Sequence, residues 1–147
     1  GDGCMECLNI LCRSCLMYNF FTVHNDNRGM GPCIGNESIP PVQLDALMGI
    51  VSALQDMLVY SSGSELHIAE GLTDKLLHGS AGPFCVKGGG TISAQWDFEK
   101  NKFEFQAAGI KGLKKIIIPP RFKFENGENE MDILFEDNRK YTIRFFK

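Results

Sequence analysis

Four cysteines near the amino terminus have the spacing that most resembles a chemical site. Cys4 and Cys7 form one Cys-x2-Cys pair, and Cys12 and Cys15 form a second pair after four intervening residues. Two thiolates at this spacing can hold one metal ion, as they do in zinc sites. The residues between the pairs are largely apolar, whereas metal-binding loops are usually polar and glycine-rich. We therefore expect buried structural thiols, with disulfides or a zinc or iron–sulfur site as the alternatives.

Two looser pairs of residues could support nucleophilic catalysis. Cys33 follows His24 by nine residues within a loop rich in glycine and proline, and Cys85 follows His78 by seven residues. A cysteine nucleophile needs a histidine in contact with it and a third group that orients the histidine. The spacings show neither, so we expect a binding protein rather than an enzyme. Residues 88–90 are three glycines without the pattern of a phosphate-binding loop, which predicts a turn that leads into a strand.

A cationic stretch, called the basic segment here, lies between residues 107 and 124 and contains no acidic residue. Its cations are Lys111, Lys114, Lys115, Arg121 and Lys123. Isoleucine, leucine and phenylalanine alternate with them. Such a segment can bind the phosphates of nucleic acid or an anionic membrane surface. It is also typical of an edge strand that lysines and prolines protect from unwanted pairing, and we favour the edge strand.

The composition is that of an ordinary globular domain. The chain has 147 residues, of which 44% are hydrophobic and 22% are charged, with a formal net charge of −3. These values exclude a disordered or collagen-like chain and argue against a generally basic nucleic-acid binder. No run of about 18 uncharged apolar residues occurs, so we expect no membrane-spanning helix. We expect one domain over residues 1–147, and we favour a reducing, intracellular setting while the compartment stays open.

The elements that must position these residues differ between the two halves of the chain. Residues 1–23 are cysteine-rich, with either a short helix or a strand at 4–15 and a strand at 16–23. Residues 24–41 are rich in Asn, Asp, Gly and Pro, which predicts a loop of functional length. Residues 42–59 show helical spacing of apolar side chains, namely Leu44, Leu47, Met48, Val51, Leu54 and Leu58. The helical region extends to residue 79, with a second helix at 65–78 or a strand at 66–69 followed by a short helix.

From residue 84 to residue 147 the apolar period changes to two, which is typical of strands with one buried face. The pattern predicts strands at 91–98, 103–106, 114–118, 122–125, 131–136 and 141–145. The Asn126-Gly127 pair predicts a hairpin turn. Short connections favour sequential pairing. The predicted fold is therefore α+β: a C-terminal antiparallel meander of about five strands packed on one long amphipathic helix, with an N-terminal strand or short helix added.

The phenylalanines suggest what such a fold could bind. Nine of the eleven Phe follow residue 83, and a sheet lined with Phe can enclose an apolar cavity. The sequence therefore predicts a non-enzymatic interaction domain that binds a protein partner or a hydrophobic ligand through its sheet and the 24–41 loop. The alternatives are a small metal-binding module on the four early cysteines and a binder of anionic surfaces through the basic segment. Apart from the possible zinc, no cofactor is expected.

Overall fold

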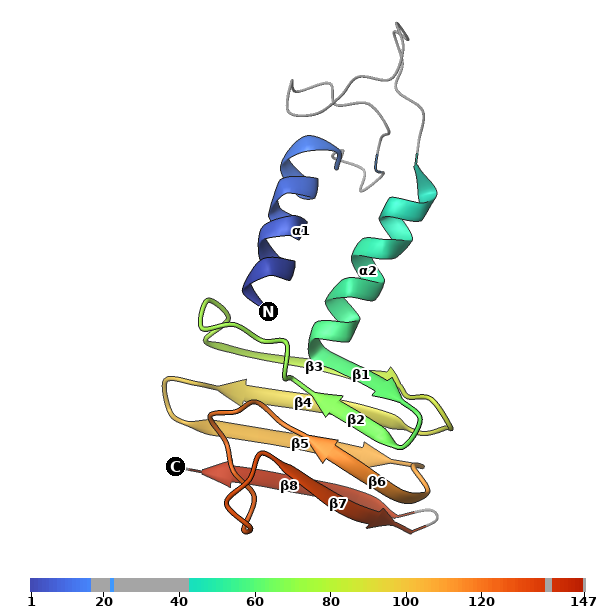
Figure 1. Cartoon of the computed structure of the whole chain (residues 1–147), viewed down its shortest axis with the longest axis vertical. Helices are drawn as coiled ribbons and strands as arrows, with labels where there is room; N and C mark the ends of the chain where they lie inside the picture. Colours follow the sequence, from blue (N-terminus) through green and yellow to red (C-terminus); the bar gives the residue numbers. More distant parts are fainter. Residues whose placement is uncertain (17–21, 23–42, 137–138, 147) are drawn as a thin grey trace, which may run out of the picture. The chain divides into compact units, whose positions relative to one another are not determined.

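The computed structural model describes residues 1–16, 22, 43–136 and 139–146, and these contain two helices and eight strands. The predicted α+β class is confirmed. The contacts within the chain divide it into two compact units, Gly1–Leu54 and Gln55–Lys147. Helix α1 (Asp2–Ser14) and most of helix α2 (Leu44–Leu58) belong to the first unit, and all eight strands belong to the second (Figure 1). A single domain over residues 1–147 stays a prediction.

Helix α1 resolves the first ambiguity of the sequence, because residues 4–15 are helical rather than extended. Asp2 in its first turn and Arg13 in its last turn complement the helix dipole. The predicted strand at 16–23 falls mostly outside the described residues, where only an isolated antiparallel bridge between Leu16 and Thr22 is seen. The predicted loop at 24–41 also lies outside them.

Helix α2 matches the predicted helix at 42–59, but its predicted role is wrong. Leu44, Met48 and Val51 of its apolar stripe are 56%, 70% and 60% exposed. These three side chains are not part of the buried core, which strand residues and their connections form. The apolar face of each sheet is covered by the other sheet instead, because the second half of the chain supplies enough strands for two layers.

The strands form two four-stranded sheets that pack face to face. The first sheet has the order β1 (Val59–Ser62), β2 (Glu65–Ile68), β6 (Gly112–Ile117), β7 (Glu130–Phe135). The second has the order β3 (His78–Cys85), β4 (Thr91–Asp97), β5 (Lys102–Ala108), β8 (Lys140–Phe146). Neighbouring strands are antiparallel except β2 and β6, which are parallel. In Figure 1 the strands of the first sheet are drawn in front of those of the second.

The predicted sequential pairing of a C-terminal meander is therefore wrong. The β4–β5 hairpin forms as expected, with Asn101 at a positive φ of 50° in its turn. The chain then changes sheet: β5 pairs with β8, and β6 pairs with β7. The predicted strand at 122–125 is part of the connection between β6 and β7, where the N–H of Gly127 donates to the carbonyl of Phe124 at 2.9 Å. Phe122 and Phe124 alternate with charged residues because they are buried there, not because they are in a strand.

Residues 59–78 distinguish the two alternatives that the sequence left open for this segment. The helix predicted at 65–78 is absent from this described segment. The alternative strand at 66–69 is confirmed by β2, but the short helix predicted to follow it is not formed. The end of α2 is fixed to the following loop by two backbone hydrogen bonds, from Ala69 N–H to Leu58 O and from Gly71 N–H to Met57 O. A side chain at Gly71 would approach the Met57 backbone to 2.7 Å, so this position requires glycine.

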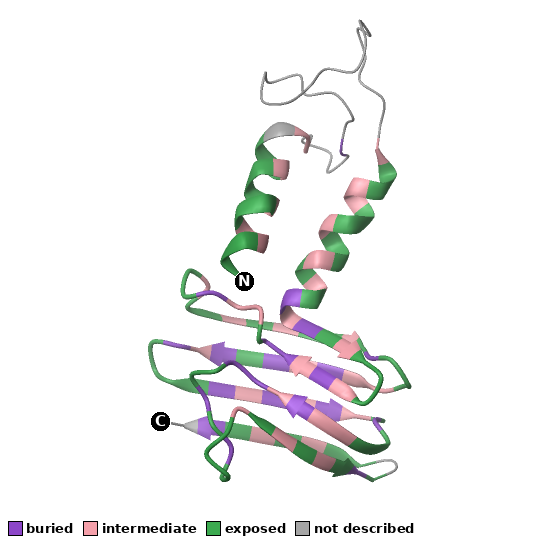
Figure 2. Cartoon of the chain, in the orientation of Figure 1, coloured by how far each residue is buried: buried purple, intermediate pink, exposed green. Residues whose placement is uncertain are grey.

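The core lies between the two sheets. Buried and exposed residues alternate along the strands, as Figure 2 shows. The largest fully buried side chains of the strands come from both layers: Leu66, Ile68, Ile92, Phe103, Phe105 and Ile116. Phe122 from the β6–β7 connection and Phe145 from β8 stack on Phe103, with ring centroids 5.3 Å and 5.7 Å away. The alternation thus identified the buried face correctly.

Candidate binding sites

Cys4, Cys7 and Cys12 lie on α1 and Cys15 caps its C-terminal end, and the four do not converge. Cys4 and Cys15 are half-buried, while Cys7 and Cys12 are exposed, so the prediction of buried thiols is wrong for the latter two. None of these four cysteines forms a disulfide, and neither does Cys85. In the part of the chain that the structure describes, no three His, Cys, Asp or Glu side chains form a group that could hold a metal ion. A metal at these cysteines stays a prediction.

The predicted nucleophile pairs gain no support from the described residues. His24 and Cys33 lie outside them. His78 and Cys85 are the first and last residues of β3, and a strand rises about 3.3 Å per residue, so the two residues are at opposite ends of the strand, on the order of 20 Å apart, and are not in contact.

The basic segment is not an edge strand, which corrects the favoured interpretation. Strand β6 is hydrogen-bonded to β2 on one side and to β7 on the other. Lys114 and Lys115 are consecutive and therefore face opposite sides of the sheet. Lys114 Nζ donates to the carbonyl of Gly63 in the β1–β2 turn at 3.2 Å, and Lys115 Nζ lies 3.0 Å from Glu130 Oε2. The hydrogen bond to Glu130 raises the pKa of Lys115.

The remaining cations of the basic segment occupy other surfaces. Arg121 pairs with Asp74 at 3.0 Å, and its guanidinium lies 4.3 Å from the centre of the Phe98 ring. Lys111 and Lys123 are exposed. The five cations therefore do not form one positive patch, and binding of an anionic surface stays a prediction.

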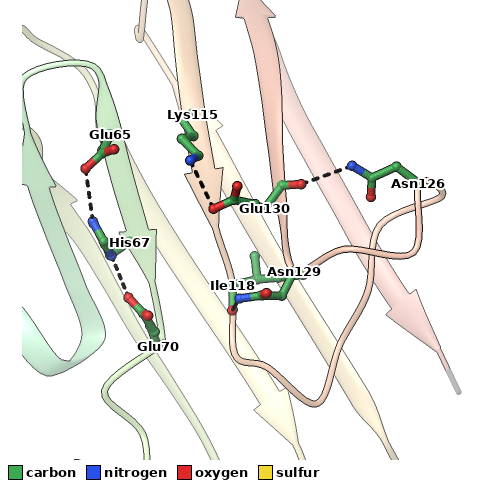
Figure 3. A network of polar contacts seen from close by, with 8 residues as sticks. All are labelled: Glu65, His67, Glu70, Lys115, Ile118, Asn126, Asn129 and Glu130. Carbon is green, nitrogen blue, oxygen red and sulfur yellow. Dashed lines mark hydrogen bonds and ion pairs between the residues drawn. The ribbon is translucent and has the colours of Figure 1, made fainter.

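Polar side chains on the outer face of the first sheet contact one another in a network (Figure 3). His67 Nδ1 lies 2.5 Å from Glu70 Oε2, and its Nε2 lies 3.7 Å from Glu65 Oε2. Across the sheet, Lys115 pairs with Glu130. Lys115 is the one lysine or arginine among the residues of this network, beside the three carboxylates of Glu65, Glu70 and Glu130.

A hollow opens where strands β7 and β8 diverge at the side of the sandwich; we call it the β7–β8 hollow. Its volume is about 540 Å³. It is lined by Arg121, Phe122, Lys123, Phe124, Glu125, Met131, Ile143, Arg144 and Phe145. The floor is apolar, since Phe122, Phe124 and Phe145 are buried, and the rim carries three cations and one carboxylate. The charge pattern of the sequence indicated the cations at 121 and 123 but not the strand residues that complete the site.

Strand β8 forms one wall of this hollow and is an edge of the second sheet. It pairs with β5 over its whole length of seven residues. In the described structure no backbone hydrogen bond reaches its other edge from outside the strands. The opposite edge, β3, is interrupted by a bulge between Ala81 and Phe84 and contains Pro83. The first sheet ends in β1, of four residues, and β7, of six. The edge of β8 is therefore the longest that is free of proline.

The outer face of the second sheet carries an ordered polar cluster. Glu104 Oε2 accepts a hydrogen bond from Arg144 Nε at 2.5 Å, and its Oε1 accepts one from Gln106 Nε2 at 3.0 Å. The hydrogen bond from Arg144, followed by that from Gln106, lowers the pKa of Glu104. Nearby, the hydrogen bonds from Lys100 lower the pKa of Asp97. The polar residues that alternate with the apolar ones in these strands could have predicted the cluster, because adjacent strands place their outward side chains next to one another in rows.

A pH dependence follows from Glu104. Because its folded pKa is depressed, its ionised form stabilises the fold above the ordinary glutamate pKa of about 4.3, and this contribution is lost as the pH falls through the folded value. We expect Glu104→Gln to remove about 0.2–1 kcal/mol at neutral pH and to flatten the acid side of the stability profile. Thermal unfolding from about pH 7 to about pH 3 measures this. Glu128→Gln is the control, and parallel profiles for wild type and Glu104→Gln would contradict the expectation.

No helix among the described residues has the length and apolar content to cross a membrane. No known protein family matches the sequence. The chain is similar to α-L-fucosidase 2 of Arabidopsis thaliana, with 37% identity over 67 residues, which is 45% of this chain. The matched stretch is 8% of that protein, so the similarity concerns a small part of it.

Proposed function

We propose that this chain is a non-catalytic interaction domain that binds an extended segment of a protein partner along the free edge of β8. The observation that carries the proposal is the position of that edge beside the β7–β8 hollow. An added strand gains main-chain hydrogen bonds from a sheet edge, and a pocket beside the edge selects its side chains. The 24–41 loop, which we also expected to contribute, lies outside the described residues.

The lining of the hollow indicates the chemistry of the bound segment. An apolar side chain fits the floor formed by Phe124, Met131 and Ile143. Burial of such a side chain contributes about 1.5–3 kcal/mol, which is enough to select it over a polar one. Of the three cations at the rim, Arg121 is already paired with Asp74 and Arg144 with Glu104, so Lys123 is the cation that can pair with a bound segment. We therefore expect an acidic residue next to the apolar one in the partner segment.

Peptide selection tests this proposal directly. A displayed library of random heptapeptides is selected on the full chain, and the enriched peptides are synthesised and titrated into the protein. We expect them to carry an apolar residue beside an acidic one and to slow hydrogen exchange of the β8 amides. Peptides that leave β8 amides unprotected, or a selection without enrichment, would contradict edge pairing.

A matched pair of variants locates the binding. Met131→Gln makes the hollow polar at nearly constant side-chain volume, and we expect it to weaken peptide binding about tenfold. Met48→Gln makes the same chemical change on α2, where Met48 is 70% exposed, and should leave binding unchanged. Equal effects of both variants would rule out the hollow.

A hydrophobic small molecule is the second candidate for the same hollow, because its floor is apolar and its volume is about 540 Å³. Hydrogen exchange separates the two ligands. A small molecule in the hollow would perturb Met131 and Ile143 without protecting the backbone of β8, whereas an added strand protects alternate β8 amides.

A further inference from the structure

The outer face of the second sheet is hollowed along β3, β4 and β5 into a feature that we call the polar trough. Two adjoining depressions of about 220 Å³ and 370 Å³ share Gln95 and Glu104 in their lining. The other polar residues of the trough are Ser80, Ser93, Asp97, Lys100, Lys102, Gln106 and Arg144. This surface is separate from the β7–β8 hollow except for Arg144, which lines both.

Small residues line one end of the trough, so no large side chain fills it there. Ser80 pairs with Gln95 across β3 and β4, while Ser93 pairs with Gln106 across β4 and β5. Gly82, at a φ of 109°, lies at the bulge of β3. A Cβ at Gly82 would come within 2.6 Å of Ile92 O and 3.0 Å of Ser93 Oγ, so no side chain can fill this end.

The charges of the trough are paired with one another. Arg144 holds Glu104, and Lys100 Nζ lies 2.9 Å from Asp97 Oδ2. These pairs fix the carboxylates in their ionised form and leave Lys102 as the remaining charge of the lining. A ligand of strong positive or negative charge therefore gains little from this surface, and a neutral ligand fits it best.

The hydrogen-bonding groups of the trough are mixed donors and acceptors. Gln95, Ser80 and Ser93 have no side-chain hydrogen bond to any described residue. A serine hydroxyl and a glutamine amide can each donate and accept. A ligand with many hydroxyl groups, each both donor and acceptor, complements such a row without leaving polar atoms unsatisfied.

From this juxtaposition we propose that the polar trough binds a neutral saccharide, with Gln95 and Gln106 as its main hydrogen-bonding residues and Ser80 and Ser93 beneath the sugar. Glu104 acts as a positioning residue, because its contact with Gln106 Nε2 turns the carbonyl oxygen of that amide away from Glu104, where it can accept from a sugar hydroxyl. The trough lacks an exposed aromatic ring among its lining residues, so its affinity rests on hydrogen bonds and binding is weak and specific.

The test is a titration of the ¹⁵N-labelled full chain with neutral hexasaccharides: cellohexaose, xylohexaose, mannohexaose and maltohexaose. We expect at least one of them to shift the amide signals of Ser80, Ser93, Gln95 and Gln106 in a saturable manner. Gln95→Ala should weaken that binding at least about fivefold, whereas Gln55→Ala, the same change on α2, should not alter it.

Three outcomes would overturn the proposal. The first is that none of the four hexasaccharides shifts the trough amides. The second is that Gln95→Ala and Gln55→Ala bind equally well. The third is stronger binding of hexagalacturonate, a polyanion, because the paired charges argue for a neutral ligand. Failure here leaves peptide binding at β8 unaffected, since the heptapeptide titration reports on the β7–β8 hollow.

Discussion

Replacement of Phe103 by alanine should lower the free energy of unfolding by about 3–5 kcal/mol, the largest effect that we expect from a single core truncation. Phe103 is 1% exposed and contacts rings from three parts of the chain. Its neighbours are Phe105 on β5, Phe122 in the β6–β7 connection and Phe145 on β8. Removing the ring leaves a cavity, because the paired strands around it cannot move enough to fill the space. The loss is a large fraction of the about 5–15 kcal/mol that stabilises a typical domain.

Urea unfolding followed by the fluorescence of Trp96, the one tryptophan of the chain, measures this change. The midpoint should fall while the slope stays constant, because the surface exposed on unfolding is nearly the same. Leu134→Ala is the control, since Leu134 is 65% exposed, and it should change stability by less than about 0.5 kcal/mol. A loss below about 1 kcal/mol for Phe103→Ala would mean that the two sheets do not share one core.

Replacement of Gly90 by alanine should be more damaging than the same change at Gly89, its neighbour in the triglycine turn. Both have positive φ, 89° and 99°, which costs a side chain about 1–2 kcal/mol. At Gly90, however, a Cβ would lie 2.6 Å from Gly109 C and from Ile110 N, whereas at Gly89 nothing lies within 4 Å. The overlap is with backbone, which cannot rotate away, and adds about 1–3 kcal/mol.

The comparison of the two alanine variants isolates packing from backbone strain. Gly89→Ala should lose about 1–2 kcal/mol and Gly90→Ala about 2–5 kcal/mol in the same urea titration. Equal losses would show that the contact between the triglycine turn and the β5–β6 connection is not tight. The triglycine turn was predicted only to lead into a strand. Its Gly90 is also required because the backbone at Gly109 and Ile110 packs directly against it.

The sequence predicted the strands better than their partners. Period-two alternation is a local property, so it located β4, β5, β7 and β8 and identified Phe103 and Phe105 as inward-facing. It carries no information on which layer covers the buried face, and for that reason the helix was chosen over a second sheet. It also misread Phe122 and Phe124, because a buried connection can alternate as a strand does.

The candidate sites were harder to predict because each depends on residues from several strands. Arg121 and Lys123 were recognised from their charge, but Met131, Ile143 and Phe145 join them only through the change of sheet after β7. Gln95 and Glu104 stand opposite each other through the register of β4 and β5. A correct register would have placed them in one row, so the missing information was the pairing rather than the residue types.

The parallel pairing of β2 with β6 has a consequence for how the chain acquires its structure during synthesis. Glu65 meets Lys115, and the β3–β4–β5 hairpins lie between these two positions in the sequence. A ribosome must therefore release about fifty further residues before β2 finds its neighbour, and such distant contacts slow folding. Until then β2 has only the four-residue β1 beside it. The apolar side of this β1–β2 hairpin therefore stays uncovered until the later half of the polypeptide has been synthesised.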